Sequence, residues 1–175
     1  MQVTVLPVGE LQCNCYLVEN HSEALLIDPG DELEKILDLI KDKQVIGVLI
    51  THHHFDHVGC VEALKNDYHY PIYDYNNLKE GKHQLGTFKF EVINTFGHTM
   101  DSVSYYFEKE RIMFTGDFLF YDTVGRYDFE ESNVNEMFKS IEKIKSYPDD
   151  IVIYPGHGIK TTLGREKQAN LYFFN

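Results

Sequence analysis

The chain has 175 residues with 28 acidic and 16 basic side chains, which gives a formal net charge of −12. This length fits one domain with a buried core, and the acidic excess disfavours nucleic acid, whose backbone requires a basic partner. The first residues lack a secretory signal pattern and no stretch reaches transmembrane length. We therefore predict a single domain over residues 1–175 and a cytoplasmic protein that contacts no membrane.

Hydrophobic periodicity assigns most of the first half of the chain to short strands and one clear helix. We predict four strands over residues 3–8, 15–19, 24–28 and 45–50, and a helix over residues 33–41. After a histidine-rich segment, a second helix is expected to bury Val58, Val61 and Leu64. The polar residues 77–86 are predicted to form a loop.

The second half continues with strands and ends with helices. Strands are predicted over residues 88–95, 103–108, 111–115 and 151–154, and a final short helix over residues 162–171. Asn133 is a candidate helix N-cap because Glu136 follows three residues later, and this helix places Met137, Ile141 and Ile144 inward. Periodicity alone indicates an α/β or α+β protein.

The three cysteines are predicted to be small buried residues rather than partners in disulfides. Cys13, Cys15 and Cys60 form an odd number, and no secretory signal precedes them, so a disulfide framework is not expected. Free cysteine is among the residues that are most often buried.

The segment 52–57 reads HHHFDH and directly follows an apolar strand. Side chains alternate along an extended backbone, so His52, His54 and Asp56 can point in one direction while His53 points in the other. His57 stands where a helix should begin and can return toward the same point. Three imidazoles and a carboxylate that converge would be costly without a cation, so this segment predicts a metal site.

Three further residues that can bind a metal follow other predicted strands. His98 stands after the strand over residues 88–95, Asp117 after 111–115, and His157 after 151–154. Functional groups in layered α/β folds gather at strand ends, on loops that a rigid sheet holds. Glycines beside these residues allow tight turns and close approach of the backbone. We predict one site that combines these residues with the segment 52–57.

With these motifs the chain resembles the metallo-β-lactamase superfamily, and within it the glyoxalase II-like hydrolases. The resemblance extends over nearly the whole chain and includes LIDPG at 26–30, HHHFDH at 52–57, GHT at 97–99, TGD at 115–117, GRYD at 125–128 and PGHG at 155–158. It implies an α+β fold, the four-layer αββα sandwich. One departure is FGHTMDS at 96–102, where the family often has PGHTPGS; the histidine is kept and the neighbouring pocket wall differs.

The resemblance also implies two divalent metal ions. Zinc is the default, and nitrogen and oxygen ligands suit iron or manganese as well. The implied ligands of the first ion are His52, His54 and His98, those of the second are Asp56, His57 and His157, and Asp117 bridges the two.

The implied reaction is hydrolysis by a metal-held water. Two ions that share a water lower its pKa and hold it as hydroxide, and one ion can polarise a substrate carbonyl. We assign Asp56 and Asp117 to the catalytic centre. Asp28 can orient a ligand histidine as a hydrogen-bond acceptor. Arg126 is expected to steady the site through Asp128 or Asp56, or otherwise to contact an anionic substrate.

We expect a small-molecule thioester or ester as the substrate, as in glyoxalase II. Full-length glyoxalase II enzymes carry a helical C-terminal domain that binds glutathione, whereas only 18 residues follow His157 here. The resemblance is therefore to compact members without that domain. Two alternatives stay open: a persulfide dioxygenase with one iron, and a metal-binding protein without catalysis. The sequence indicates no oligomeric state.

Overall fold

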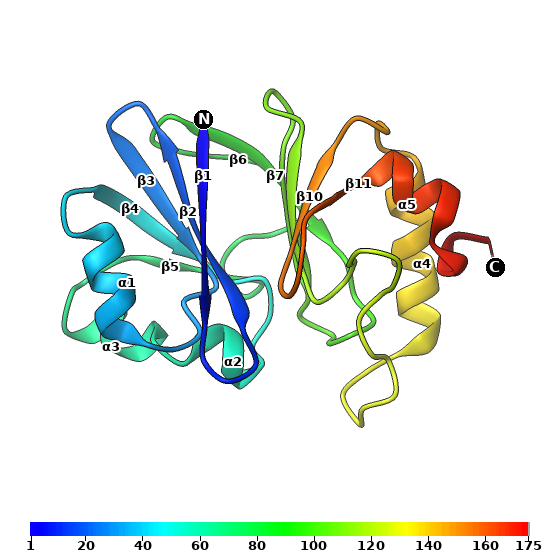
Figure 1. Cartoon of the computed structure of the whole chain (residues 1–175), viewed down its shortest axis with the longest axis horizontal. Helices are drawn as coiled ribbons and strands as arrows, with labels where there is room; N and C mark the ends of the chain where they lie inside the picture. Colours follow the sequence, from blue (N-terminus) through cyan, green and yellow to red (C-terminus); the bar gives the residue numbers. More distant parts are fainter. Residues whose placement is uncertain (175) are drawn as a thin grey trace.

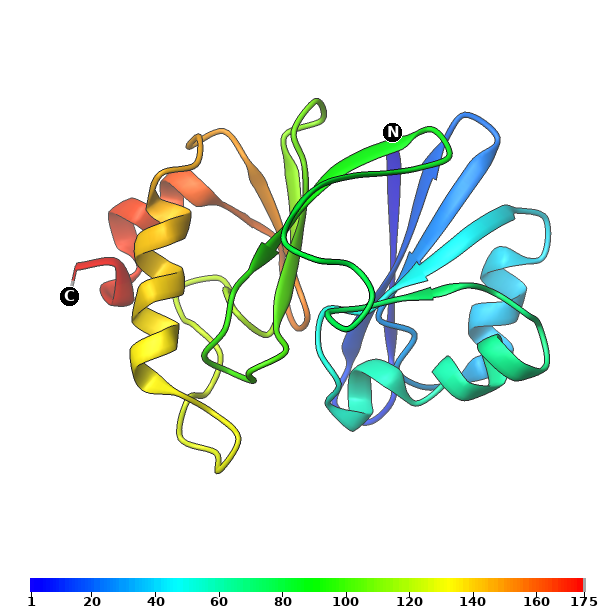
Figure 2. The same ribbon diagram turned by 180° about the vertical axis from the view of Figure 1, so that it is seen from behind.

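The computed structural model describes residues 1–174 and arranges them as two β-sheets packed face to face between two outer layers of helices (Figure 1). The view from behind in Figure 2 shows the same four layers, with the helices on the two outer sides. This is the αββα sandwich that the family resemblance implied, and the predicted fold class is confirmed. No helix within residues 1–174 is long and apolar enough to cross a membrane.

The first sheet has five strands in the order β1-β2-β3-β4-β5. Strands β1 to β3 are antiparallel, and β4 and β5 continue parallel to β3. The strands are β1 (Gln2–Val8), β2 (Cys13–Asn20), β3 (Glu23–Ile27), β4 (Gln44–Leu49) and β5 (Ile72–Tyr73). The helices of this half are α1 (Leu33–Ile40), α2 (Phe55–Val58) and α3 (Val61–Asn66).

The second sheet has six strands in the order β11-β10-β9-β8-β7-β6, and only the β9–β10 pair is parallel. Its strands are β6 (Gly81–Leu85), β7 (Phe88–Asn94), β8 (Val103–Phe107), β9 (Ile112–Gly116), β10 (Val152–Pro155) and β11 (Thr161–Thr162). Its helices are α4 (Val134–Lys145), α5 (Leu163–Ala169) and the 3₁₀ helix η1 (Leu171–Phe174).

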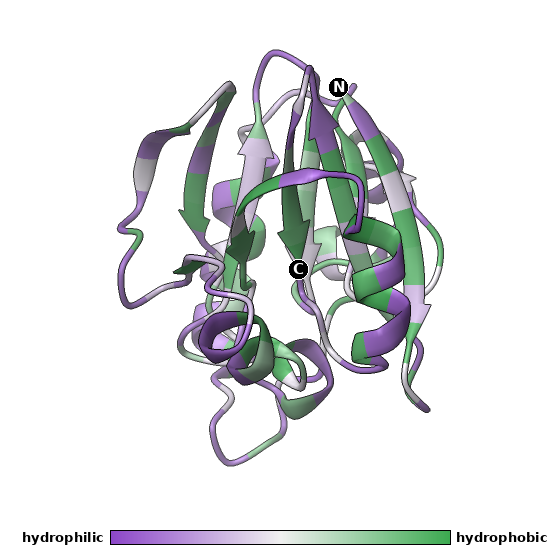
Figure 3. Cartoon of the chain, turned by 90° about the vertical axis from the view of Figure 1, so that its left-hand side faces the viewer, coloured by the Kyte–Doolittle hydropathy of each residue, from purple (hydrophilic) through white to green (hydrophobic). Residues whose placement is uncertain are grey.

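Three hydrophobic clusters hold the four layers together. The central one lies between the sheets and joins residues such as Leu49 of β4 to Phe90 of β7 and Phe114 of β9. Each outer cluster packs one sheet against its own helices. Figure 3 views the side that carries α1 and shows mainly hydrophobic strands behind helices that also carry hydrophilic residues. Burial of apolar surface between layers is the dominant favourable contribution to such a fold.

The prediction of a loop over residues 77–86 is wrong, because this segment contains strand β6. β6 pairs with β7 in an antiparallel register, from Gly81 opposite Val92 to Leu85 opposite Phe88. It is the outer strand of its sheet, and its burial alternates with a period of two, so that Lys82 and Gln84 are exposed. An edge strand with one solvated face can therefore be polar and still pair.

The single helix predicted after the histidine segment is divided into two, α2 and α3. The backbone at Gly59 packs so closely on the loop after β3 that an added Cβ would lie 2.1 Å from the carbonyl oxygen of Gly30. Leu64 is fully buried as predicted, whereas Val58 and Val61 are only partly buried. The two strands β5 and β11 were not predicted, and each has only two residues.

Other local predictions are confirmed. The side chain of Asn133 caps α4 by accepting hydrogen bonds from the backbone N–H groups of Asn135 and Glu136. The three cysteines are buried and form no disulfide within the described chain.

Candidate metal centre

The first half of the molecule supplies four of the predicted ligands from one short segment. Strand β4 ends at Leu49, the chain bends at Thr51, and His54, which precedes α2, is extended. His52 points inward and is buried, while His53 points outward. His57, on the single turn of α2, is fully buried and returns to the same place. The alternation predicted for His52, His53 and His54 is confirmed, whereas Asp56 lies on α2 and belongs to a different group of potential ligands.

The second half supplies three ligand-capable residues from separate connections. His98 lies in the loop after β7, Asp117 directly follows β9, and His157 follows β10 with Gly156 between them. Close packing brings these loops together: a Cβ at Gly156 would lie 2.2 Å from Oδ1 of Asp117 and 2.7 Å from Cε1 of His57. Only glycine fits at this position, so the end of β10 can approach the other half.

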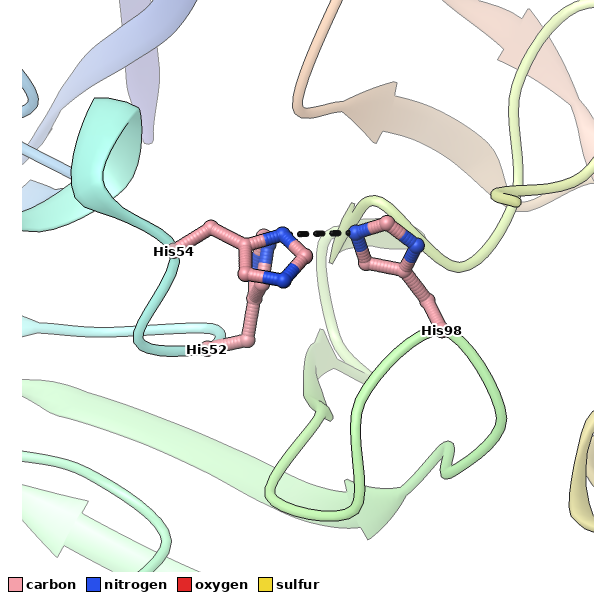
Figure 4. A group of neighbouring side chains, drawn as sticks. All are labelled: His52, His54 and His98. Carbon is pink, nitrogen blue, oxygen red and sulfur yellow. Dashed lines mark hydrogen bonds between the residues drawn. The ribbon is translucent and has the colours of Figure 1, made fainter. Parts of the chain in front are cut away.

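These seven residues meet at one place between the sheets, in three overlapping groups. Within each group the potential ligand atoms lie within 4.8 Å of one another. The groups are His52, His54 and His98; His52, His57 and Asp117; and Asp56, His57 and His157. In Figure 4, His52 and His54 come from one loop and face His98 from the other half, with 2.9 Å between Nδ1 of His54 and Nε2 of His98.

Asp117 lies in the middle of the cluster. Its Oδ1 is 3.3 Å from Nε2 of His57, and its Oδ2 is 3.6 Å from Nε2 of His98 and 3.5 Å from Nε2 of His157. Oδ2 of Asp56 lies 3.2 Å from the same nitrogen of His157. One carboxylate thus faces histidines of both predicted ligand sets, as a bridging ligand would.

A second observation indicates that these residues can bind a cation. Three buried polar atoms of this cluster make no hydrogen bond among the described residues, namely Nε2 of His52, Nε2 of His57 and Oδ1 of Asp117, although the last two lie 3.3 Å apart. A buried polar atom without a partner costs about 1–3 kcal/mol, so such atoms are normally paired. All three converge on the same point, where a metal ion would satisfy them.

The outward nitrogens of the histidines are held by neighbouring groups. Nδ1 of His57 lies 2.9 Å from Oδ2 of Asp28, which also accepts the hydroxyl hydrogen of Thr51. Oδ1 of Asp28 accepts the backbone N–H of Thr51 at 2.8 Å. Asp28 is therefore buried against a predicted ligand, in the position that the sequence analysis assigned to it. Such a partner sets the tautomer and orientation of the imidazole.

The other four histidines have partners that the sequence analysis missed. Nδ1 of His98 lies 2.7 Å from the carbonyl oxygen of Arg126, and Nδ1 of His157 lies 3.0 Å from that of Leu11. The remaining two pairs are His52 with the hydroxyl of Thr51 and His54 with the carboxylate of Glu131. A backbone carbonyl carries no sequence signature, so only the side chains of Thr51 and Glu131 could have been noticed beforehand.

Burial and neighbouring charge set the protonation of the cluster. Burial lowers the pKa of His52 well below its ordinary value, and the positive charge on His57 lowers it further. Burial opposes the charge on His57 itself, but the carboxylates of Asp117 and Asp28 outweigh it and raise that pKa. Burial also opposes ionisation of Asp117, yet the nearby imidazolium holds its pKa well below the usual range. Metals bind neutral imidazoles and ionised carboxylates, so an ion at this site would displace the proton that the carboxylates favour on His57.

Arg126 contacts Asp128 and not Asp56. Its guanidinium makes a two-pronged contact with Asp128, at 2.9 and 3.1 Å, and stacks on the ring of Phe129. The side chains of both ion-pair partners are more than 60% exposed. The contact of Arg126 with the site is therefore its carbonyl oxygen, which holds His98, and not the guanidinium that the sequence analysis emphasised.

Comparison with known proteins identifies the family of this chain. The family model described as the metallo-beta-lactamase superfamily matches residues 8–80 and 74–157. Hydroxyacylglutathione hydrolase GloC of Haemophilus influenzae is 31% identical over 97% of both chains. Among solved structures, the BLEG-1 B3 metallo-beta-lactamase has a TM-score of 0.94 with 30% identity, over 99% of this chain and 100% of that chain.

A second structure bears on the metal. TTHA1623, solved in a di-iron-bound form, has a TM-score of 0.89 with 34% identity, and the match covers 97% of this chain and 99% of that one. Together, the family model, the αββα sandwich and the cluster of histidine and aspartate side chains able to bind metal lead to one conclusion. The chain belongs to the metallo-beta-lactamase superfamily.

Proposed function

We propose that this protein is a metal-dependent hydrolase that cleaves a thioester or ester of a small molecule. Membership of a metallo-hydrolase superfamily supports a hydrolase, and the similarity to GloC supports the thioester. The observation that carries the proposal is the convergence of three buried atoms without partners, on His52, His57 and Asp117, at a point between the two sheets.

Two divalent ions are proposed as cofactors, with zinc as the default. His52, His54 and His98 would hold one ion, Asp56, His57 and His157 the other, and Asp117 would face both. When bound, such ions supply an activated water and polarise a carbonyl.

The protein's own residues prepare the site for this chemistry. Asp28 and the carbonyl oxygens of Arg126 and Leu11 hold the imidazoles in one tautomer, so that their other nitrogens point inward. The carboxylate of Asp56 is partly exposed, 3.2 Å from His157, and can take up the proton that hydrolysis releases. Partial exposure of His54, Asp56 and His157 also distinguishes this site from a closed structural metal site.

The proposal requires metal and turnover together, and both can be measured on the purified protein. We expect two ions per chain by elemental analysis, and cleavage of S-lactoylglutathione or of a neutral acetyl thioester. Removal of the metal by a chelator should abolish turnover, and its return should restore it. Hydrolysis that is indifferent to the chelator would refute the mechanism.

Adjacent histidines provide a matched control, because His54 points into the cluster and His53 points away from it. His54→Ala should lose metal and activity, whereas His53→Ala should keep both.

One iron per chain, with oxygen consumed on a persulfide and no thioester cleaved, would favour the dioxygenase. Metal retained without any turnover would favour a binding protein. Cytoplasmic location and the absence of nucleic-acid or membrane partners remain predictions.

A further inference from the structure

A hollow with apolar walls opens beside the predicted ligand His157. It has a volume of about 440 Å³, and its other lining residues are Phe120, Tyr121, Gly158 and Ile159. The side chain of Ile159 is 66% exposed, and Tyr121 is 42% exposed. Large apolar side chains that stay exposed side by side at the edge of a candidate catalytic site are typical of a binding surface.

One wall of this hollow is held rigidly from outside. The guanidinium of Arg165, on α5, lies 3.7 Å from the centroid of the Tyr121 ring. The same group makes two hydrogen bonds to Asp122, at 2.7 and 3.0 Å. The fully buried carboxylate of Glu166 accepts the backbone N–H of Asp122 at 2.9 Å. The aromatic wall is thus fixed before any ligand arrives, which lowers the entropy lost on binding.

The apolar surface continues on the other side of His157. The carbonyl oxygen of Leu11 contacts this histidine, and the Leu11 side chain is 55% exposed. Leu11 and Phe55, which is 76% exposed, line a second hollow that also contains Asp56. Exposed apolar groups therefore flank both of the partly exposed ligands of the second predicted ion.

The two hollows offer no cationic side chain to an anionic substrate. Neither of these two hollows has a lysine or arginine among its lining residues, and Glu10 and Asp31 line the one beside Asp56. Arg126 and Arg165 are already paired, with Asp128 and Asp122, and Lys160, which follows Ile159, does not line either hollow. A ligand with several carboxylates would find no free cationic side chain among the residues that line these two hollows.

We propose that the hollow beside His157 binds an uncharged, apolar group of the substrate, an aliphatic or aromatic acyl chain or thiol, in preference to a carboxylate-bearing one. This inference rests on the proposed hydrolase function. It goes further by assigning Phe120, Tyr121 and Ile159 to substrate recognition.

Two substrate series test the inference. They also show whether the acyl chain or the thiol of the substrate occupies the hollow. In one, acyl chains of increasing length are joined to a fixed neutral thiol; in the other, a fixed acetyl group is joined to neutral thiols of increasing length or to glutathione. We expect kcat/KM to rise about two- to four-fold per added methylene in one series, as expected for burial of a CH₂ group. The series that responds identifies the group in the hollow. The glutathione ester should be a poorer substrate than the neutral thioesters.

Binding provides a readout that does not depend on catalysis. Thioethers keep the carbon chain but have no carbonyl to hydrolyse, and calorimetry should show affinity that rises with chain length. Ile159→Glu should remove this dependence, with metal content and thermal stability unchanged. Val5→Glu is the matched control, because Val5 is an exposed residue of β1 that lines neither hollow, and it should behave like the original protein.

The possible outcomes distinguish failure of the apolar hollow from failure of the proposed hydrolase activity. Turnover without any dependence on chain length, or equal effects of the two glutamate variants, would overturn the apolar hollow and leave the hydrolase. Thioether binding with chain-length dependence but no turnover of any ester would support the hollow and overturn the hydrolase. The absence of both would overturn both.

Discussion

The two halves of the molecule build the candidate site in different ways. The first half supplies His52, His54, Asp56 and His57 from one segment of six residues, whereas the second half supplies its three residues from three separate connections. The supports differ as well. In the first half, His57 is held by the side chain of Asp28, while His98 in the second half is held by a backbone carbonyl.

This difference determines where a substitution can damage the site. A side-chain support can be removed by changing one residue, whereas a carbonyl support survives any substitution that keeps the backbone path. The site should therefore be sensitive at Asp28 and tolerant at Arg126, although both positions contact a predicted ligand. The predictions below test this contrast.

The largest effect is expected at Asp117, which faces both halves. Asp117→Ala removes the only carboxylate of the cluster that lies within 4 Å of histidines of both sets. We expect both metal ions to be lost, or both bound weakly, with activity reduced at least about 100-fold. Elemental analysis and thioester turnover measure this. Asp150→Ala, which removes an exposed carboxylate, serves as control, and a variant that kept one ion and full activity would contradict the bridging role.

A smaller but clear loss is expected for Asp28→Asn. The substitution preserves shape, and asparagine tolerates the left-handed backbone at this position, where φ is 50°. One oxygen becomes an NH₂ group, which cannot accept a hydrogen bond from Thr51 or His57. We expect metal affinity to fall about 10- to 100-fold and unfolding free energy by about 1–3 kcal/mol.

Metal titration and urea unfolding would measure these two losses. Asp38→Asn, on the exposed face of α1, should leave both quantities unchanged. If Asp28→Asn behaved like that control, the support of His57 by Asp28 would be unnecessary.

A modest pH effect is expected from His53, which links the two halves. It contacts Asp101 of the second half and Asp74 of the first. The hydrogen bond to Asp101, opposed by burial, raises the pKa of His53 above its ordinary value. Its contribution to stability is therefore complete below the unfolded-state pKa of about 6.5 and is lost as pH rises through the higher folded-state value.

Urea unfolding between about pH 5.5 and 9, with metal in excess, would detect this contribution as a difference between the original protein and His53→Gln. The original protein should lose more stability than the variant as the pH rises. Parallel pH profiles would show that the link between the halves carries no charge-dependent stability.

The smallest effect is expected for Arg126→Ala. The ion pair with Asp128 is exposed to solvent, and exposed pairs contribute little. The carbonyl oxygen that holds His98 remains in the variant. Metal affinity should change by less than about twofold, and turnover of a neutral and an anionic thioester should be affected equally. A tenfold loss of metal would show that the guanidinium supports the site, as the sequence analysis had expected.

The sequence was sufficient to predict the fold class and to bring the seven ligand-capable residues into one hypothesis. The reason is local: an extended backbone orients His52 to His54, the turn of α2 returns His57, and His98, Asp117 and His157 each follow an apolar strand. Strand β6 was missed because an edge strand needs only one apolar face. The break between α2 and α3 was also missed; it falls at Gly59, whose backbone packs closely against Gly30, a residue distant in the sequence.

Only the tertiary structure decided how the site is supported and what surrounds it. The carbonyl oxygens of Leu11 and Arg126 reach their histidines from positions 146 and 28 residues away in the chain. The wall at Tyr121 is held by Arg165, 44 positions later. Every residue carries the same backbone carbonyl group, so a sequence does not show which carbonyl contacts a histidine. A hollow forms only where loops that are distant in the sequence do not contact one another. The sequence alone therefore determined which groups can bind a metal, while the packing of the two halves determined their partners and the apolar surface beside them.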